Sequence, residues 1–247
     1  MQSLRTLWQH LRSLNIPVYS ANACFFLTLA AVPALSLLTR LPGLDTESLN
    51  RFLAPLLPDP LRQAAERFLA YLGSRSATAL GISGFALLWS AGRGMQGIVT
   101  GLNAVYRVPG NSGYLRRRFF STVYMLLFLA VLTVTLGVQV FLEGLLRDVN
   151  FRFFLLPALQ VPVFCLMFTA LPNRKNRFRD SLPGALFAAW GWLILSRLFS
   201  YYVTHFSAAH RLYGPLSTPV LGMLWLYFSL CLFFYGGALN AFLKKKP

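Results

Sequence analysis

ATALGISGFALLWSAGRGMQGIVTGLNAVYR, residues 77–107, indicates what class of protein this is. The segment is apolar enough, and at about 20 residues or more long enough, to cross a lipid bilayer as a helix. Arg93 lies in its interior, and an arginine at mid-membrane costs about 2.5–3.5 kcal/mol on insertion scales. We therefore expect Arg93 to face protein or water rather than lipid. The glycines expected to let this helix flex or pack closely are Gly92, Gly94, Gly97 and Gly101.

Composition supports a membrane protein over its whole length. Of 247 residues, 56% are hydrophobic and 12% are charged, and the mean hydropathy is +0.55. A soluble domain carries about 25% charged residues, so residues 1–247 are predicted to form a single polytopic membrane domain. A formal charge of +16 would suggest nucleic acid in a soluble protein. The three cysteines lie in apolar runs, and no disulfide framework is implied.

The fold class predicted is an all-α integral membrane protein. Two amphipathic stripes around Pro58-Asp59-Pro60, within residues 40–76, predict helices along the outer face. These helices could form a structural cover or a lid over a cavity. Residues 1–16 predict a further amphipathic helix at the cytoplasmic interface. Six transmembrane helices are predicted, over residues 18–39, 77–106, 119–142, 151–171, 181–203 and 217–243.

Basic residues are distributed unevenly between the two sides of this topology. The N-terminus, the connections after the second and fourth spans and the C-terminus carry thirteen of the 23 Lys and Arg residues with one acid. The other connections carry eight, together with six of the seven acids. By the positive-inside rule both termini are expected in the cytoplasm. The net charge is thus mainly a topology signal, and we expect no nucleic-acid partner.

Several motifs are present without the context that their chemistry needs. Residues 92–97 match G-x-G-x-x-G, but an apolar helical run precedes them and no acidic residue follows about twenty positions later. His205 and His210 are five residues apart, with no acidic residue in their connection. No acidic residue lies inside a predicted span, so paired carboxylates are absent there. We expect no catalytic residue, no metal site and no cofactor.

Arg93 and Arg197 remain as candidates for function. Each could cap backbone carbonyls or extend to the membrane surface, or both could face an internal cavity and attract an anionic head group. Polar residues in the spans and connections could complete such a site, although most of them serve packing between helices. The candidate substrate-binding residues are Arg93, Arg197, Asn103, Gln139, Tyr213 and Asn240. Two further glycines, Gly214 and Gly237, join the packing or flexing group.

Three blocks resemble the YihY/BrkB family of bacterial inner-membrane proteins. They are ACFFLTLAAVP at 23–33, LWSAGRGMQGIVTGLNAVYRV at 88–108, and a C-terminal block from LPNRKNRFRDSLPGALFAAW through RLYGPLSTPVLGMLWLYF to GGALN. Two positions depart from the family pattern. Ala30 stands where the first-span signature usually has serine, and Ala238 replaces a buried glutamate. The second change puts in question any mechanism based on that carboxylate.

The resemblance implies six spans in the cytoplasmic membrane and little chemistry, because the family has no settled activity. Its older ribonuclease label looks like a misassignment, so we expect no enzyme. Envelope and serum-resistance phenotypes of members suggest a transporter or exporter of an anionic amphiphile or envelope lipid. The alternative is a non-transporting scaffold that binds partner proteins or anionic lipids through the basic cytoplasmic loops. Expected partners are the bilayer and anionic lipids, with a homo-oligomer left open.

Overall fold

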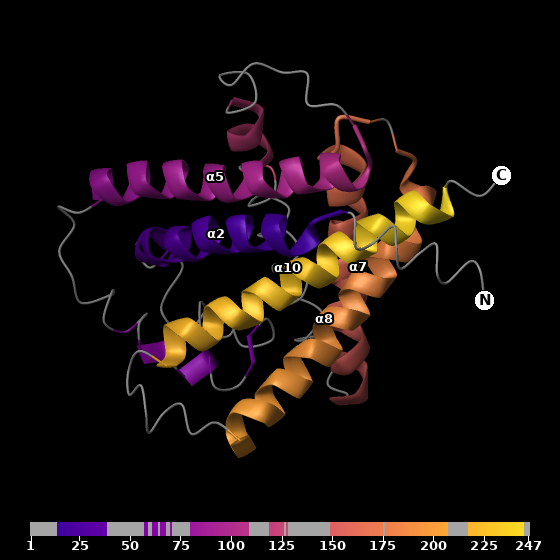
Figure 1. Cartoon of the computed structure of the whole chain (residues 1–247). Helices are drawn as coiled ribbons and strands as arrows, with labels where there is room; N and C mark the ends of the chain where they lie inside the picture. Colours follow the sequence, from indigo (N-terminus) through magenta and orange to yellow (C-terminus); the bar gives the residue numbers. More distant parts are fainter. Residues whose placement is uncertain are drawn as a thin grey trace.

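The computed structural model describes residues 14–38, 57–58, 61–63, 65–67, 70, 80–108, 119–125, 127, 149–174, 176–206 and 217–244. Within these ranges the only regular secondary structure is helical, which confirms an all-α chain there (Figure 1). The long helices are α2 (Ile16–Leu38), α5 (Leu80–Val105), α7 (Val149–Ala170), α8 (Phe178–Phe206) and α10 (Ser217–Leu243).

Two described helices are long and apolar enough to cross a membrane, over Phe178–His205 and Pro219–Leu243. Shorter apolar helices cover Ile16–Ala31 and Pro157–Ala170. Five predicted spans coincide with α2, α5, α7, α8 and α10 to within a few residues. The predicted third span is helical at 119–125, and its remainder lies almost entirely outside the described residues. Residues 1–13, most of 40–76, and 207–216 also lie outside them, so six spans and the topology stay predictions.

α2 and α5 form a close antiparallel pair, with glycine positions along the contact. A Cβ atom added at Gly97 would lie 3.2 Å from the Cα of Ala23, and one added at Gly101 would lie 3.0 Å from the Cβ of Tyr19. These distances leave almost no space for a side chain. The absent side chains therefore allow the two helix backbones to approach.

α5 ends in a regular helix-capping motif. The Val108 N–H donates to the Asn103 carbonyl at 2.8 Å, and the Arg107 N–H donates to the Ala104 carbonyl at 3.1 Å. This pair of bonds is the Schellman pattern, which requires a left-handed residue between the last turn and the exit. Arg107 occupies that position with a φ of 54°. The motif fixes where the polar end of α5 lies.

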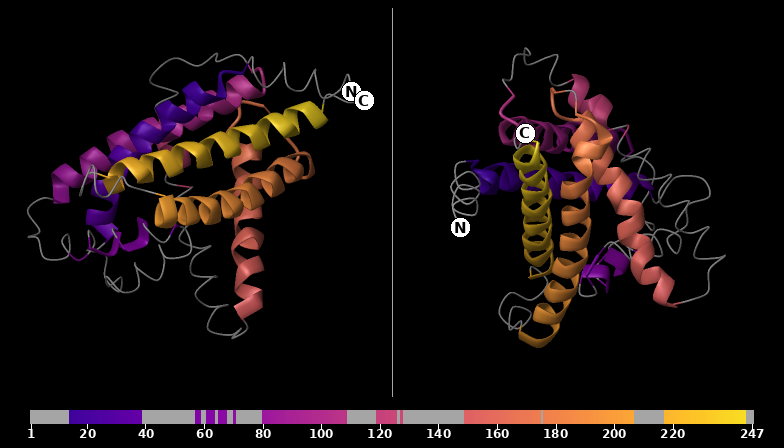
Figure 2. Two further views of the ribbon diagram at one scale, coloured as in Figure 1. Left: turned by 60° about the horizontal axis from the view of Figure 1, so that its bottom comes forward. Right: turned by 90° about the vertical axis from the view of Figure 1, so that its right-hand side faces the viewer.

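α8 and α10 form a second antiparallel pair, which lies side by side in both views of Figure 2. Gly184 and Gly236 face each other, and a Cβ atom at Gly184 would collide with the Gly236 carbonyl oxygen. Further along, the Trp225 Nε1–H donates to the Ser196 hydroxyl at 3.2 Å. The two helices are therefore in backbone contact at one end and in side-chain contact at the other.

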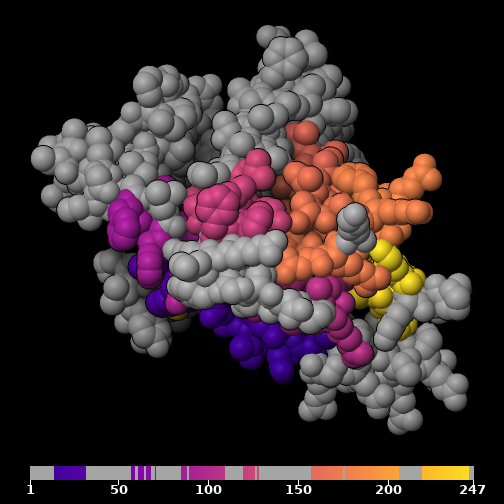
Figure 3. Space-filling model, turned by 90° about the horizontal axis from the view of Figure 1, so that it is seen from above, coloured from indigo at the N-terminus to yellow at the C-terminus, as the bar shows by residue number. Residues whose placement is uncertain are grey.

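α10 is the central helix of the described fold. It packs against α2, α5 and α8, while α7 packs against α8. Phe234 is completely buried, and the rings of Phe168 and Phe233 stack with centroids 4.6 Å apart. Figure 3 shows the described helices packed as one body on the face that it presents.

The outer surface of these helices is apolar. On α8 the exposed large apolar side chains include Leu186, Trp190, Ile194 and Leu198, the last with 62% of its surface exposed. Isolated exposed apolar residues are ordinary on soluble proteins, but a continuous apolar face needs an apolar environment. This surface is typical of a helix that faces lipid.

The Gly184–Gly236 contact generates a stability prediction. Gly184→Ala should lower the free energy of unfolding by at least about 2 kcal/mol, because the new methyl group overpacks a backbone contact. Thermal unfolding of the detergent-solubilised protein measures the effect. Gly222→Ala is the matched control on α10, since among the described residues its added Cβ atom would meet only Leu61, at an ordinary contact distance of 3.7 Å. Equal melting temperatures for the two variants would contradict the proposed importance of the backbone contact.

Candidate functional site

A polar stripe runs along α5 from its middle to its C-terminal end. Arg93, Gln96, Thr100 and Asn103 follow one another at spacings of three or four residues and therefore share one face of the helix. Asn103 is buried and the other three are half-buried. With a rise of about 1.5 Å per residue, Arg93 lies about 15 Å along α5 from Asn103. The stripe connects the middle of an apolar helix with its polar end.

The Arg93 guanidinium contacts an aromatic ring of α2. Its guanidinium carbon lies 5.3 Å from the centre of the Phe26 ring on α2, which is within cation–π range. The Arg93 Nε and the Gln96 Oε1 are buried, and neither has a hydrogen-bond partner in the part of the chain that the structure describes. Buried polar atoms without partners are costly, and a bound ligand can satisfy them.

The described carboxylates are already engaged elsewhere. Glu66 pairs with Arg62 at 3.6 Å, and Asp180 pairs with Lys244 at 3.1 Å. Among the described residues, therefore, Arg93 has no ion-pair partner. An arginine of this kind attracts an anion, because a partly buried charge is screened less than one in water.

Asn240 links α10 to the beginning of α8. Its Oδ1 accepts a hydrogen bond from the Gly184 N–H at 2.6 Å, and its Nδ2 donates to the Ser181 carbonyl at 3.1 Å. Pro183 lies between these two residues and has no N–H, so the hydrogen-bond ladder of α8 is interrupted there. The buried Asn240 amide bonds to the backbone on both sides of the interruption.

Asn103 makes the equivalent link from α5. Its Oδ1 accepts a hydrogen bond from the backbone N–H of Asn173, which lies in the connection between α7 and α8. The 2.8 Å distance indicates a well-formed bond. The C-terminal end of α5, the start of α8 and the end of α10 thus meet at one end of the fold, and asparagine side chains provide links at both places.

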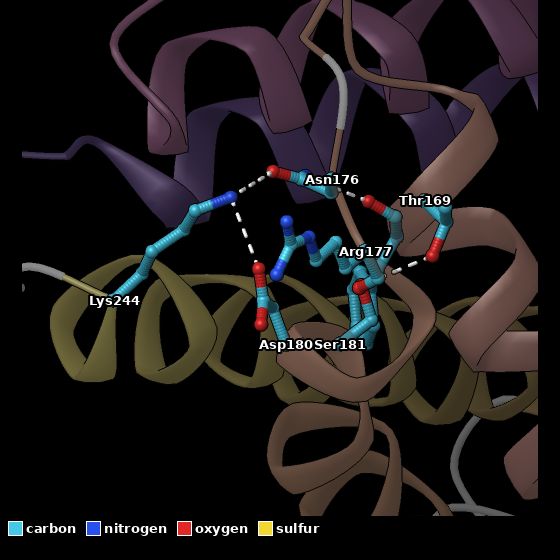
Figure 4. Close-up of polar contacts among 7 residues, drawn as sticks. Thr169, Asn176, Arg177, Asp180, Ser181 and Lys244 are labelled. Carbon is cyan, nitrogen blue, oxygen red and sulfur yellow. Dashed lines mark hydrogen bonds and ion pairs between the residues drawn. The ribbon is translucent and has the colours of Figure 1, made fainter.

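A further set of polar contacts holds the connection between α7 and α8 (Figure 4). The Thr169 hydroxyl lies 3.1 Å from the Ser181 hydroxyl. The Asn176 amide donates to the Phe168 carbonyl at 3.1 Å and accepts from the Lys244 ammonium at 3.3 Å. Because Lys244 also pairs with Asp180, the connection is attached to both of its helices and to α10.

The sequence candidates lie in different parts of the fold. Arg93 and Asn103 share the stripe on α5, and Asn240 belongs to the helix junction described above. Arg197 is exposed on α8, a helix whose main packing partners are α7 and α10, whereas α5 packs mainly on α2. A cavity shared by Arg93 and Arg197 stays a prediction. Gln139, Tyr213 and Gly214 lie outside the described residues.

The remaining residues singled out from the sequence lie where helices pack against one another. Gly92, Gly94, Gly97 and Gly101 lie within α5, and an added Cβ atom at any of the last three would contact α2. Gly237 lies within α10, where an added Cβ atom would meet Leu102 at 3.2 Å. Ala238, at the family's glutamate position, is fully buried in the hydrophobic core.

Sequence reasoning missed Gln96 and Thr100 as members of the stripe, and it missed the backbone partners of Asn240. The stripe could have been found, because the three-or-four-residue spacing from Arg93 to Asn103 is visible in the sequence. The partners of Asn240 could not, since they lie 56 and 59 residues away along the chain.

Comparison with known proteins gives a family and several relatives. A family model described as "Virulence factor BrkB" matches residues 7–247. The "Putative ribonuclease-like protein YfkH" of Bacillus subtilis (strain 168) is 30% identical over 246 residues, covering 92% of this chain and 90% of that protein. A "UPF0761 membrane protein" of Rhodospirillum centenum (strain ATCC 51521 / SW) is 28% identical over 236 residues, which cover 93% of this chain but 51% of the relative.

A second "UPF0761 membrane protein", from Pseudoalteromonas translucida (strain TAC 125), is 32% identical over 78 residues, or 32% of this chain and 26% of the relative. The chain thus spans most of the Bacillus relative and about half or less of the other two. No solved structure matches the chain.

The role of Asn240 can be tested by removing its amide. Asn240→Leu should lower the free energy of unfolding by about 2–4 kcal/mol, because it leaves the buried Gly184 N–H and Ser181 carbonyl without this partner. Chemical unfolding in detergent measures the loss. Ser229→Ala is the control, since that buried hydroxyl donates to the Trp225 carbonyl of its own helix and no bond to another described helix is seen. A similar small loss in both variants would show that Asn240 does not link the helices energetically.

Proposed function

The chain belongs to the virulence factor BrkB family, whose UPF0761 relatives are named membrane proteins, and from that premise we propose that it transports or exports an anionic amphiphile, such as an envelope lipid. The site of this movement is the bacterial cytoplasmic membrane, across or within its leaflets. The observation that carries the proposal is Arg93, a half-buried cation on an apolar helix with no carboxylate partner among the described residues.

An anion is the ligand class that best fits this arrangement. The cation–π contact with Phe26 orients the guanidinium but does not neutralise its charge. A phosphate or carboxylate can accept two parallel hydrogen bonds from arginine, including one from Nε. Gln96 adds an amide beside it that can donate through its nitrogen. Binding an anion here would therefore satisfy both the charge and the unpaired donor.

An amphiphile fits better than a small hydrophilic ion because exposed aromatic side chains adjoin the polar stripe on α5. Phe85 and Trp89 continue the same face of α5 on the side away from the polar end, and 70% and 51% of their respective surfaces are exposed. Their rings stack with centroids 6.3 Å apart. A ligand whose head group contacts Arg93 would place its apolar part against these rings. The polar stripe toward Asn103 would provide the path for the head group.

Arg197 has the role of a second anion contact in this proposal. It is exposed on α8 beside Leu198 and Tyr201, which are 62% and 58% exposed. An arginine among lipid-facing side chains is well placed for the head group of a lipid and poorly placed for a ligand enclosed in protein. The proposal includes no bond-breaking step.

A lipid-translocation assay tests the role of Arg93. Proteoliposomes would contain a trace of fluorescent NBD-labelled phosphatidylglycerol or phosphatidic acid, and dithionite would report how fast inner-leaflet probe becomes accessible. The wild type should accelerate exchange over protein-free vesicles. Arg93→Gln should slow it about ten-fold or more, because a charge-assisted hydrogen bond contributes about 1.5–3 kcal/mol.

The matched control is Arg67→Gln, which removes one exposed charge away from α5 and should leave the rate unchanged. Labelled phosphatidylcholine, which is zwitterionic, should be insensitive to Arg93→Gln. If the wild type moves neither anionic probe, transport is the wrong function and the non-transporting scaffold becomes the better hypothesis. If both arginine variants slow exchange equally, Arg93 is not the specific contact.

A further inference from the structure

Three exposed arginines lie close together where α7 connects to α8. Arg174 and Arg177 belong to the connection, and Arg179 lies in the first turn of α8. We propose that they form a binding site for the phosphate group of anionic phospholipids at the membrane surface. This site is separate from Arg93 and does not depend on transport.

The electrostatics of this end of the fold favour an anion. The described carboxylate here is Asp180, and it is paired with Lys244 at 3.1 Å, so the two charges offset each other. The arginines are left as a net positive group. Guanidinium groups bind phosphate through two parallel hydrogen bonds, which makes arginine better suited than lysine to a defined phosphate site.

Hydrogen bonds hold the described residues of the connection that carries the arginines. The Arg174 N–H donates to the Pro172 carbonyl at 2.7 Å, and the Asn173 N–H donates to Asn103 of α5. Asn176 is bonded to both Phe168 and Lys244 (Figure 4). Because these residues are already held in place, a ligand loses little conformational entropy in organising them. A loose basic loop would attract anions without defining a site.

The exposed face of α8 places this group at head-group depth. Arg179 and Arg197 both lie on that face, 18 residues apart in the numbering, which corresponds to about 27 Å along a helix. The exposed side chains between them include Leu186, Trp190 and Ile194. A charged–apolar–charged pattern of this length matches the ~30 Å hydrocarbon core. Arg179 therefore lies at one boundary of the core and Arg197 near the other.

Phe178 completes the site as an interfacial contact. Its side chain is 51% exposed at the first residue of α8, directly beside Arg177 and Arg179. Aromatic side chains at the ends of membrane helices are favourable at the level of the head groups. A phospholipid bound here would place its phosphate on the arginines and the upper part of its acyl chains against Phe178 and Leu182, which is 39% exposed.

Native mass spectrometry of the purified full chain tests the site. The protein would be incubated in detergent with equal amounts of phosphatidylglycerol and phosphatidylcholine, and the ratio of the two retained lipids would be measured. The wild type should retain phosphatidylglycerol preferentially. A variant with Arg177→Gln and Arg179→Gln should lose at least ten-fold in this ratio, since each basic residue near a membrane surface contributes about five-fold.

The control variant, Arg62→Gln with Arg67→Gln, removes the same formal charge from an exposed segment elsewhere. It should retain the wild-type ratio, and the melting temperatures of both variants should match that of the wild type because all four side chains are exposed. If both variants lose selectivity equally, only general charge attraction operates and the site is disproved. If the wild type retains both lipids equally, the lipid assignment is wrong and an acidic protein becomes the better occupant.

Discussion

The two hydrogen bonds of the Asn240 side chain hold the described helices in their arrangement. They join α10, the helix with the most packing partners, to α8 at the point where Pro183 interrupts its backbone ladder. The bonds can form because Gly184 and Gly236 allow the two backbones to touch. In an apolar environment a buried amide that satisfies two backbone groups stabilises far more than an exposed one. This junction therefore fixes the crossing of α8 and α10.

The same junction separates the molecule into two parts with different physical character. At its level, asparagine side chains and the Lys244–Asp180 pair connect α5, α7, α8 and α10 into a rigid polar end. Farther along α5, Arg93 and Gln96 carry buried polar atoms that have no hydrogen-bond partner among the described residues. The polar end contains one such atom as well, the Tyr106 hydroxyl just after α5. Arg93 differs from the others because its side chain carries a charge.

Much of the described fold follows from the sequence. Apolar runs of the right length predicted the positions of α2, α5, α7, α8 and α10 within a few residues, because helix is the structure that satisfies its own backbone in an apolar medium. α8 begins at Phe178 rather than at the predicted 181, since Asp180 and the polar residues around it suit a helix N-terminus although they are not apolar. Hydropathy alone cannot detect that first turn.

The candidate site was only partly predictable from the sequence, because some of its contacts join residues that are far apart along the chain. Arg93 and Asn103 stood out as polar residues in an apolar helix, and their shared face follows from spacing. Asn240 also stood out, but its role depends on the approach of Gly184 and Ser181, which are distant in sequence. Local patterns also gave no means of telling that Arg197 is exposed on α8 while Arg93 lies against Phe26.

The unpaired charge of Arg93 has an electrical consequence. Moving one elementary charge across the full membrane thickness is worth about 2.3 kcal/mol per 100 mV, and moving it part of the way is worth the corresponding fraction. In the proposed transport cycle, the empty protein would respond to the membrane potential to the extent that Arg93 moves along the field. A bound anion would cancel that charge, so the voltage would act mainly on the resetting step of the proposed cycle.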